Sequence, residues 1–220
     1  MVNNNREYKE VLGYRERKFD HDRDLAVNEF DMMSEDFYLS GYEAILIPQV
    51  QYISKKTVIA STISFDNEVL LLKGASNNYE VKEICTDLGV SYLELDCCCN
   101  DACLVNVELV LNAHKDISHV YVEFNESNLP IINELNRICN DAKVNLIANI
   151  ESYDHSLIGR CITNQVPFVI MPNDQESVVI ASRRNLVQTE GVSSSFTYDL
   201  YTLWQNSLNK RKPCITPMTA

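Results

Sequence analysis

Residues 119–150 read HVYVEFNESNLPIINELNRICNDAKVNLIANI, and this stretch indicates the fold. It opens with a short, largely apolar run, His119 to Glu123, and closes with a second one, Val144 to Ile150. Between them, Pro130 to Asp141 is typical of a helix, because proline suits the first helical turn. A strand, a helix and a second strand at this pitch predict a βαβ unit with parallel strands.

The same alternation continues on both sides of this unit. Runs of strand length that are nearly all apolar predict strands buried on both faces. These runs are Ala44–Ile47, Glu68–Leu72, Ser91–Leu95, Pro167–Ile170 and Ser177–Ala181. Two further stretches are helix-like, Asn78–Leu88 and Val105–His114. We therefore predict an α/β fold, a three-layer α/β/α sandwich with a mostly parallel sheet.

The two ends of the chain differ from this pattern. Residues 6–40 are charged and aromatic, and their apolar positions recur at spacings near three and four, as in an amphipathic helix. The predicted organisation is a helical lead-in over 1–40, a large α/β domain over 41–205 and a polar tail over 206–220.

Composition excludes several classes of function. The 220 residues carry a formal net charge of -12, which argues against nucleic-acid binding, since that requires clustered Lys and Arg. No apolar stretch approaches the roughly 20 residues of a membrane span, and the N-terminus lacks a signal-peptide core. We expect a cytoplasmic protein that binds neither nucleic acid nor membrane.

The eight cysteines could indicate disulfide bonds or a metal site. Disulfide-dense folds are small and secreted, so free thiols are the expectation here. The run Cys97-Cys98-Cys99, followed by Cys103, could bind zinc, but no second Cys or His pair at matching spacing completes a site. The alternative is a strand end that runs into a helix, and we predict no metal site.

Other familiar motifs are missing from the sequence. The six glycines form neither Gly-x-Gly nor Gly-Lys-Ser/Thr, which argues against a Rossmann or P-loop nucleotide site. None of the histidines, His21, His114, His119 and His155, lies in a metal pair or beside a plausible nucleophile. Arg183-Arg184 could hold an anion, and a surface corner after an apolar strand explains it equally well.

Several segments resemble, in order along the chain, the class V aminotransferases, which depend on pyridoxal phosphate. Val178 to Leu186 is similar to the family's "FVIARR...L" strand, and Ser193 to Trp204 to its "SLSLDLYDQW" stretch. Asp116 to Val120 resembles the start of "DISHVAVVHCETT", and Tyr14-Arg15 with Phe19 resembles "HRDPEF". The 2-aminoethylphosphonate:pyruvate transaminases are the most similar group. The resemblance implies the large domain of a fold-type I enzyme, usually a homodimer with active sites at the interface.

The resemblance also shows where the chemistry of that family should lie. A lysine must form a Schiff base with the cofactor, and an acid must hold the pyridine nitrogen protonated. The lysine of the family's "SANK" motif corresponds here to Gln175, which cannot form a Schiff base. The aspartate of "LIVDAMS" corresponds to Asn149, and the nearby Glu151 would not point to the same place.

Two further requirements concern the phosphate and the substrate. The family's "QGSGT" cup corresponds to Pro48-Gln49-Val50-Gln51-Tyr52, where bulky residues and a proline would block the phosphate. The small domain, whose arginine holds the substrate carboxylate, is missing beyond Pro213 to Pro217. One pocket element is similar to the family, because Glu126-Ser127 resembles its "ET" pair.

The cofactor-contacting positions of the family are thus Gln49, Val50, Gln51, Glu126, Asn149 and Gln175, with no catalytic residue among them. We predict an aminotransferase-like protein that lacks transamination and acts as a binding or interaction module. It would carry no cofactor, or pyridoxal phosphate if the family activity is retained. We expect a homo-oligomer or a protein partner, because loss of the small domain should expose apolar surface.

Two alternatives remain open, so the sequence does not decide whether the protein is an enzyme. The first is an enzyme of altered chemistry, either completed by a partner chain or using a displaced amine from Lys55, Lys56, Lys73 or Lys143. The second is a metal or redox protein built on Cys97 to Cys103.

Overall fold

The structure is a computed structural model, and it describes Phe37 and residues 40–47, 51–63, 66–73, 78–96, 101–124, 129–150, 155–173 and 176–188. The chain divides after Ser40, and the elements below belong to the unit Gly41–Ala220. The predicted lead-in, apart from Phe37 and Ser40, and the predicted tail lie outside the described residues, so both stay predictions.

Strands and helices alternate along the described chain. The strands are β1 (Tyr42–Ile47), β2 (Glu68–Lys73), β3 (Ser91–Asp96), β4 (Ile117–Phe124), β5 (Asn145–Ile150), β6 (Phe168–Asn173) and β7 (Glu176–Ser182). The helices are α3 (Gln51–Thr62), α4 (Tyr79–Leu88), α5 (Asp101–Ala113), α6 (Ile132–Ala142), α7 (His155–Thr163) and α8 (Arg183–Gln188), with a 3-10 turn at Leu129–Ile131.

All of these strands join one sheet in the order β1-β7-β6-β5-β4-β2-β3. Neighbours from β6 through β5, β4 and β2 to β3 run parallel, whereas β7 is antiparallel to both β6 and β1. The carboxyl ends of the parallel strands therefore share one edge of the sheet, and β7 begins at that edge. We call this the carboxyl edge and the opposite one the amino edge.

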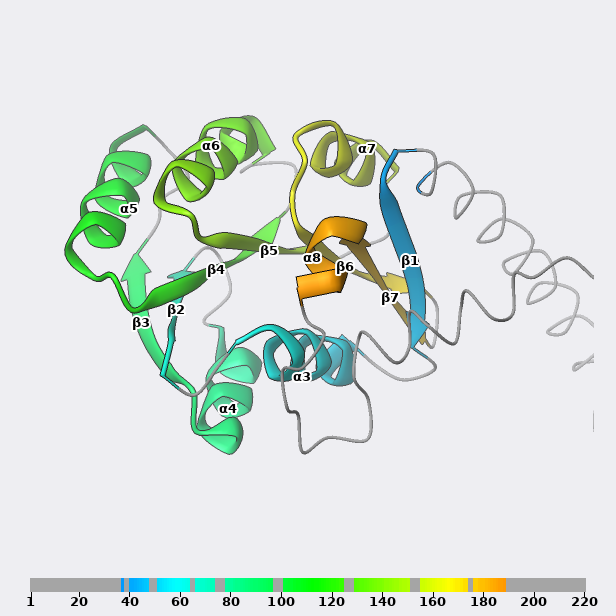
Figure 1. The fold of residues 1–220 in the computed structure, drawn as a ribbon, viewed down its shortest axis with the longest axis horizontal. Coiled ribbons are helices and arrows are strands. Elements are labelled where there is room, and N and C mark those ends of the chain that lie inside the picture. The colour runs from blue at the N-terminus through cyan, green and yellow to red at the C-terminus, as the bar shows by residue number, and fades with distance from the viewer. Residues whose placement is uncertain are drawn as a thin grey trace, which may run out of the picture. The chain divides into compact units, whose positions relative to one another are not determined.

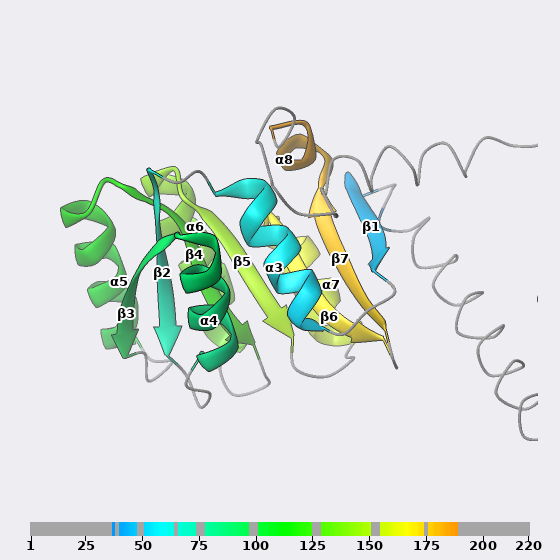
Figure 2. The same ribbon diagram turned by 90° about the horizontal axis from the view of Figure 1, so that it is seen from below.

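The helices cover the sheet in two layers (Figure 1). Helices α3 and α4 lie on one face, and α5, α6 and α7 lie on the other. Figure 2 shows α3 and α4 running side by side across the sheet. The prediction of a three-layer α/β/α sandwich with a mostly parallel sheet is confirmed. Crossover helices on both faces explain why the strands read as nearly continuous apolar runs.

The core on the α3 face joins the two helices to the middle of the sheet. Val58 and Ile59 of α3 and Ile84 of α4 pack with Tyr121 of β4 and Ile147 of β5, all of them fully or almost fully buried. Because side chains alternate along a strand, Glu123 and Asn149, each two residues further on, leave the sheet on this same face. Within the described part of the chain, no helix is long and apolar enough to cross a membrane.

One local expectation is corrected, and one helix is added. Helix α8 follows β7 directly, and Arg183 and Arg184 form its first turn. The backbone N–H of Arg183 donates to the carbonyl of Gly41, which ties this helix start to β1. Free thiols are found at the buried Cys85, Cys139 and Cys161, but Cys103 is disulfide-bonded, so the expectation of free thiols was wrong there.

Candidate functional site

A group of polar side chains lies at the carboxyl edge, on the face that α3 and α4 cover. It consists of Lys55, Asn78, Glu80, Glu123 and Asn149, and we call it the carboxyl-edge cluster. Ligands of open α/β sheets bind outside the carboxyl ends of the strands. The position of this cluster makes it the candidate functional site.

The sheet sets Glu123 and Asn149 side by side. They are register partners on the parallel strands β4 and β5, each the last residue but one of its strand. Parallel neighbours lie about 4.8 Å apart and direct paired side chains to the same face. A carboxylate and an amide therefore stand together beneath α3.

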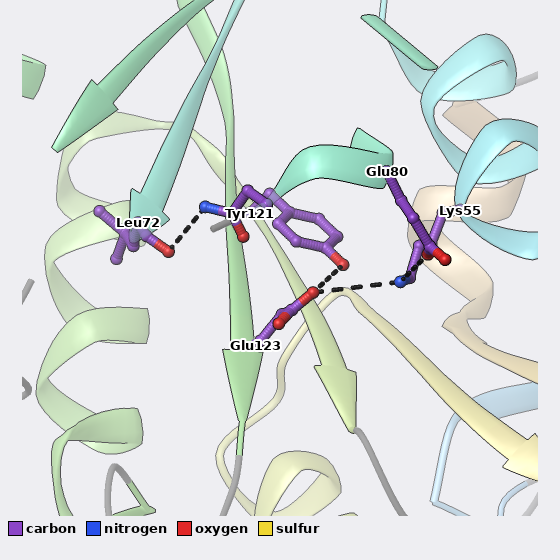
Figure 3. A network of polar contacts seen from close by, with 6 residues as sticks. Lys55, Leu72, Glu80, Tyr121 and Glu123 are labelled. Carbon is purple, nitrogen blue, oxygen red and sulfur yellow. Dashed lines mark hydrogen bonds and ion pairs between the residues drawn. The ribbon is translucent and has the colours of Figure 1, made fainter. Parts of the chain in front are cut away.

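Lys55 brings a positive charge to them from the second turn of α3. Its residue surface is 5% exposed, and its Nζ donates to Glu80 Oε2 at 2.7 Å. The same Nζ lies 4.0 Å from Glu123 Oε1, which also accepts a hydrogen bond from the Tyr121 hydroxyl at 3.4 Å. Figure 3 shows Lys55 between the two glutamates, with Glu80 entering from α4 and Glu123 from β4. The ammonium is held mainly by Glu80 and only loosely by Glu123.

Two amide oxygens of the cluster are buried without a hydrogen-bond partner among the described residues. One is Asn149 Oδ1, on a residue that is 1% exposed. The other is Asn78 Oδ1, on the residue that precedes α4, whose Nδ2 donates to the Leu72 carbonyl of β2. A buried acceptor left unsatisfied costs about 1–3 kcal/mol, so each of these two oxygens lowers the stability of the fold.

The α3 helix is anchored to the opposite part of the sheet by hydroxyls. The Oγ atoms of Ser54 and Ser177 share a hydrogen bond, and both residues are buried. Ser177 lies near the start of β7 and pairs with Pro172 of β6, so this contact also lies at the carboxyl edge. It fixes the turn of α3 that carries Lys55.

A second polar group lies at the amino edge. Its residues are Ser118, His119, Asn145, Ser182 and Asn185, and we call it the amino-edge network. The His119 ring contacts Ser118 Oγ through Nδ1 at 2.8 Å and Asn145 Nδ2 through Nε2 at 3.3 Å. Asn185 Nδ2 of α8 donates to Asn145 Oδ1 at 3.0 Å, and Ser182 Oγ donates to Asn185 Oδ1.

The network holds a neutral imidazole. Burial lowers the pKa of His119 from 6.5 to about 3. A neutral ring can accept from Asn145 at Nε2 and donate to Ser118 from Nδ1, which matches the observed contacts. These residues hold β4, β5 and α8 together and bear no charge.

Only two of the cofactor-contacting positions predicted from the family resemblance lie among the described residues. Asn149 belongs to the carboxyl-edge cluster, and Gln51 begins helix α3, where its side chain is not described. Gln49, Val50, Glu126 and Gln175 lie outside the described residues. Their contact with a cofactor therefore stays a prediction, as does that of Asn149.

The candidate amines are distributed over both edges. Lys56 pairs with Asp87 at 3.0 Å and Lys73 with Asp96 at 3.4 Å, while Lys143 follows α6 and precedes the amino end of β5. Only Lys55, of the four, reaches the carboxyl-edge cluster.

The cysteine motif is only partly covered. Cys97 to Cys99 lie outside the described residues, and Cys103 is buried in α5. Among the residues whose placement is described, no group of three or more His, Cys, Asp and Glu could hold a metal ion.

Sequence reasoning missed Glu123, Glu80 and Asn78. Glu123 carried a usable signal, because a carboxylate at the end of an apolar strand must find partners when that strand is buried. Asn78 and Glu80 carried none, since Asn and Glu at the start of a helix are common and their contacts depend on the tertiary structure.

Comparisons with known proteins place the chain near the pyridoxal-phosphate enzymes, although no protein-family model matches it. It is 24% identical over 177 residues to a bifunctional phosphonoacetaldehyde hydrolase/aminoethylphosphonate transaminase of Clostridioides difficile. The match covers 74% of this chain and 27% of that protein, so the chain spans about a quarter of that relative's length.

Solved structures show the same fold. Ureidoglycine-glyoxylate aminotransferase from Bacillus subtilis superposes with a TM-score of 0.61 at 14% identity, over 86% of this chain and 52% of that one. A serine palmitoyltransferase from S. paucimobilis with a bound pyridoxal-phosphate aldimine gives 0.54 at 13% identity, over 80% and 50%. The resemblance to this group of aminotransferases is confirmed, and the fold is that of their large domain.

The described residues of the carboxyl-edge cluster do not fit pyridoxal phosphate. The pyridine nitrogen requires a carboxylate, and the structure offers the Asn149 amide at the end of β5. The aldehyde requires a free amine, and Lys55 is held in an ion pair with Glu80. The phosphate requires donors and positive charge, whereas Glu80 and Glu123 together outnumber Lys55.

Proposed function

We propose that this protein is aminotransferase-like in fold, lacks pyridoxal-phosphate-dependent transamination, and acts as a binding module. One observation carries the proposal: the carboxyl-edge cluster pairs an amide with a carboxylate and ties its lysine to two glutamates. An amide cannot supply the countercharge that keeps the pyridine ring protonated. The chain thus has the fold of these enzymes, while the described residues of the carboxyl-edge cluster lack the charges that pyridoxal-phosphate chemistry requires.

The state of Lys55 supports this proposal. A Schiff-base lysine must present a free amine to an aldehyde. Lys55 Nζ instead donates to Glu80 Oε2 at 2.7 Å and lies 4.0 Å from Glu123 Oε1. The geometry makes Lys55 an ionic partner rather than a nucleophile.

A second candidate function is an enzyme of altered chemistry that uses Lys55 as its amine. The observation in its favour is the position of Lys55, which is almost fully buried next to the carboxyl ends of β4 and β5. This candidate requires Glu80 to release the lysine when an aldehyde enters.

A spectroscopic titration distinguishes the two functions. The protein is titrated with pyridoxal phosphate and the absorbance near the visible edge is recorded, with a Lys55→Arg variant as control. The proposal predicts the spectrum of free pyridoxal phosphate for both proteins. A saturable new band in the wild type that Lys55→Arg abolishes would establish the enzyme instead.

We also propose that the module self-associates or binds a protein partner. Val105 and Leu109 support this, because they lie one turn apart on α5 and are 56% and 62% exposed. Sedimentation at micromolar concentration should show a species larger than the monomer, and Leu109→Lys should reduce it. A strictly monomeric wild-type protein that captures no partner contradicts the proposal.

A further inference from the structure

We propose that the outer side of strand β3 pairs in antiparallel fashion with β3 of a second copy of this chain, which joins two sheets across a two-fold axis. This inference rests on the self-association proposed above and names the surface that carries it. That surface consists of β3 and the side of α4 next to it, and we call it the β3 surface.

Strand β3 is the last strand at its end of the sheet, and its inner side is fully paired. Each of its residues has a register partner on β2, from Ser91 with Glu68 to Asp96 with Lys73, without a register shift. On the outer side of β3, no strand follows among the described residues. The strand contains no proline, and its residues alternate between exposed and half-buried from Tyr92 onward. The outer N–H and C=O groups of such a strand are a template for pairing with a further strand.

The charges of β3 are neutralised within the chain. Charged side chains normally protect an edge strand from pairing. Here Glu94 Oε1 lies 2.5 Å from Nζ of Lys82 on α4, and Asp96 Oδ1 lies 3.4 Å from Nζ of Lys73 on β2. Each carboxylate of β3 therefore comes with its own cation, and a second strand meets ion pairs instead of bare charges.

Two exposed tyrosines flank one of these ion pairs. Tyr79 of α4 and Tyr92 of β3 are 72% and 36% exposed. Lys82 Nζ stands 5.5 Å from the centroid of the Tyr79 ring and also reaches Glu94, so Tyr79 and Lys82 lie on the side of α4 next to β3. Figure 2 shows α4 lying against β3. Aromatic side chains are enriched at protein interfaces, so this composition favours a protein partner.

The sequence of β3 complements itself in one antiparallel register. Side chains opposite each other across a two-fold axis leave the same face of the sheet, so the axis passes through a residue and not between two. An axis at Glu94 pairs residues 92–96 of both copies and sets this carboxylate directly opposite its own copy, which is unfavourable. An axis at Leu93 pairs residues 91–95 and sets Tyr92 opposite Glu94 of the second copy.

The Leu93 register brings complementary groups together. Opposite side chains have Cβ atoms about 4.5–5.5 Å apart, so the Tyr92 hydroxyl can donate to Glu94 of the second copy. The Lys82 that pairs with this Glu94 comes with it and can stand beside the Tyr92 ring, as cations do on aromatic faces. The two-fold axis repeats the contact, so each copy supplies one tyrosine and one ion pair. The strand is its own complement, as an interface with two-fold symmetry requires.

Sedimentation of the full chain over a range of micromolar concentrations tests the proposal. The interface is small, because each copy contributes one six-residue strand and one side of a helix. Interfaces below about 1,200 Å² belong to weak or transient complexes, so we expect a monomer–dimer equilibrium in the micromolar range.

Two matched variants at Tyr92 test the contact. Tyr92→Glu places carboxylates directly opposite each other and should weaken the dimer by about tenfold or more. Tyr92→Lys places an ammonium opposite Glu94 of the second copy and should retain the dimer. Equal dissociation constants for the two folded variants would overturn the proposal.

Leu109→Lys separates the β3 surface from the exposed side of α5. Leu109 belongs to a helix on the other face of the sheet from α4. Tyr92→Glu should weaken self-association more than Leu109→Lys does. Self-association that Tyr92→Glu leaves intact and Leu109→Lys abolishes overturns the β3 pairing and leaves the proposed function standing. A wild-type protein that stays monomeric overturns the β3 pairing and, if it captures no partner, the proposed self-association as well.

A cysteine at the two-fold axis tests the register. The Cβ separation of opposite residues is near the separation that a disulfide bridges. Leu93→Cys should therefore form a disulfide-linked dimer on mild oxidation, whereas Glu94→Cys and the wild type, with its eight cysteines, should not. Circular dichroism checks that each variant is folded. A linked dimer of Glu94→Cys, without one of Leu93→Cys, overturns the Leu93 register.

Discussion

The polar residues at the two edges of the sheet differ in how completely they are hydrogen-bonded. At the amino edge, the neutral groups of the amino-edge network satisfy one another from β4 through β5 to α8. At the carboxyl edge, Lys55 lies 2.7 Å from Glu80 and 4.0 Å from Glu123, and two amide oxygens have no partner among the described residues. A satisfied network fixes a structure, whereas buried acceptors without partners require an explanation, and a bound molecule is one such explanation. We therefore place the proposed binding function at the carboxyl edge.

The largest expected effect is at Lys55. Lys55→Met removes the buried ammonium that lies between Glu80 and Glu123, which should lower the free energy of unfolding by about 3 kcal/mol. The matched control is the next residue, because Lys56 makes a more exposed pair with Asp87. Lys56→Met should cost less than about 1 kcal/mol. Urea unfolding measures both, and equal losses would mean that Lys55 is not the buried partner of Glu123.

The next effect is at the amino edge. His119→Leu removes an acceptor from Asn145 and a partner from Ser118, in a residue that is 2% exposed. We expect a loss of about 2 kcal/mol in the free energy of unfolding, since buried polar groups are left unpaired. Thermal and urea unfolding check this value. A neutral or stabilising substitution would show that the network does not hold the amino edge together.

The pH dependence of stability should also come from the amino edge. Burial lowers the pKa of His119 from 6.5 to about 3. Between these pH values, the unfolded chain therefore binds a proton at His119 and the folded chain does not. The contribution of His119 is fully present above pH 6.5 and falls as the pH decreases toward 3, by up to ~1.4 kcal/mol per pH unit. Urea unfolding between pH 7 and 4 should show this slope, and His119→Leu should reduce it by about one proton. A slope that stays unchanged in a folded His119→Leu variant would contradict the assignment of this proton to His119.

The smallest expected effects are changes in the free energy of unfolding that have opposite signs at the two edges. Asn149→Leu replaces an unsatisfied buried amide by an apolar side chain of similar size, which should raise the free energy of unfolding by about 1 kcal/mol. Asn145→Leu at the amino edge is the matched substitution on the same strand and should lower it, because Asn185 and His119 lose their partner. Urea unfolding of the two variants should therefore give changes of opposite sign, and two losses would contradict the comparison.

The sequence predicted the architecture better than the site. Parallel strands that are buried on both faces have continuous apolar sequences, such as Val144 to Ile150. The α/β layers and most element positions could therefore be predicted. Helix α8 was missed because its six residues contain no periodic apolar pattern and follow directly on β7.

The candidate site depends on contacts that sequence spacing does not encode. Asn149 was found because a family motif marks its position, and Lys55 appeared only as one of four candidate amines. Glu80, Lys55 and Glu123 belong to α4, α3 and β4, so only the packing of both helices on the sheet brings them together. Long-range contacts of this kind require the fold before the site can be seen.

We propose that Lys55 at the carboxyl edge is an ionic partner and not a Schiff-base amine. The most direct measurement is borohydride reduction after incubation with pyridoxal phosphate, followed by intact mass and peptide mapping. We expect unmodified protein, or scattered substoichiometric labelling of exposed lysines. One stoichiometric phosphopyridoxyl adduct on Lys55, or on any other single lysine, would contradict it.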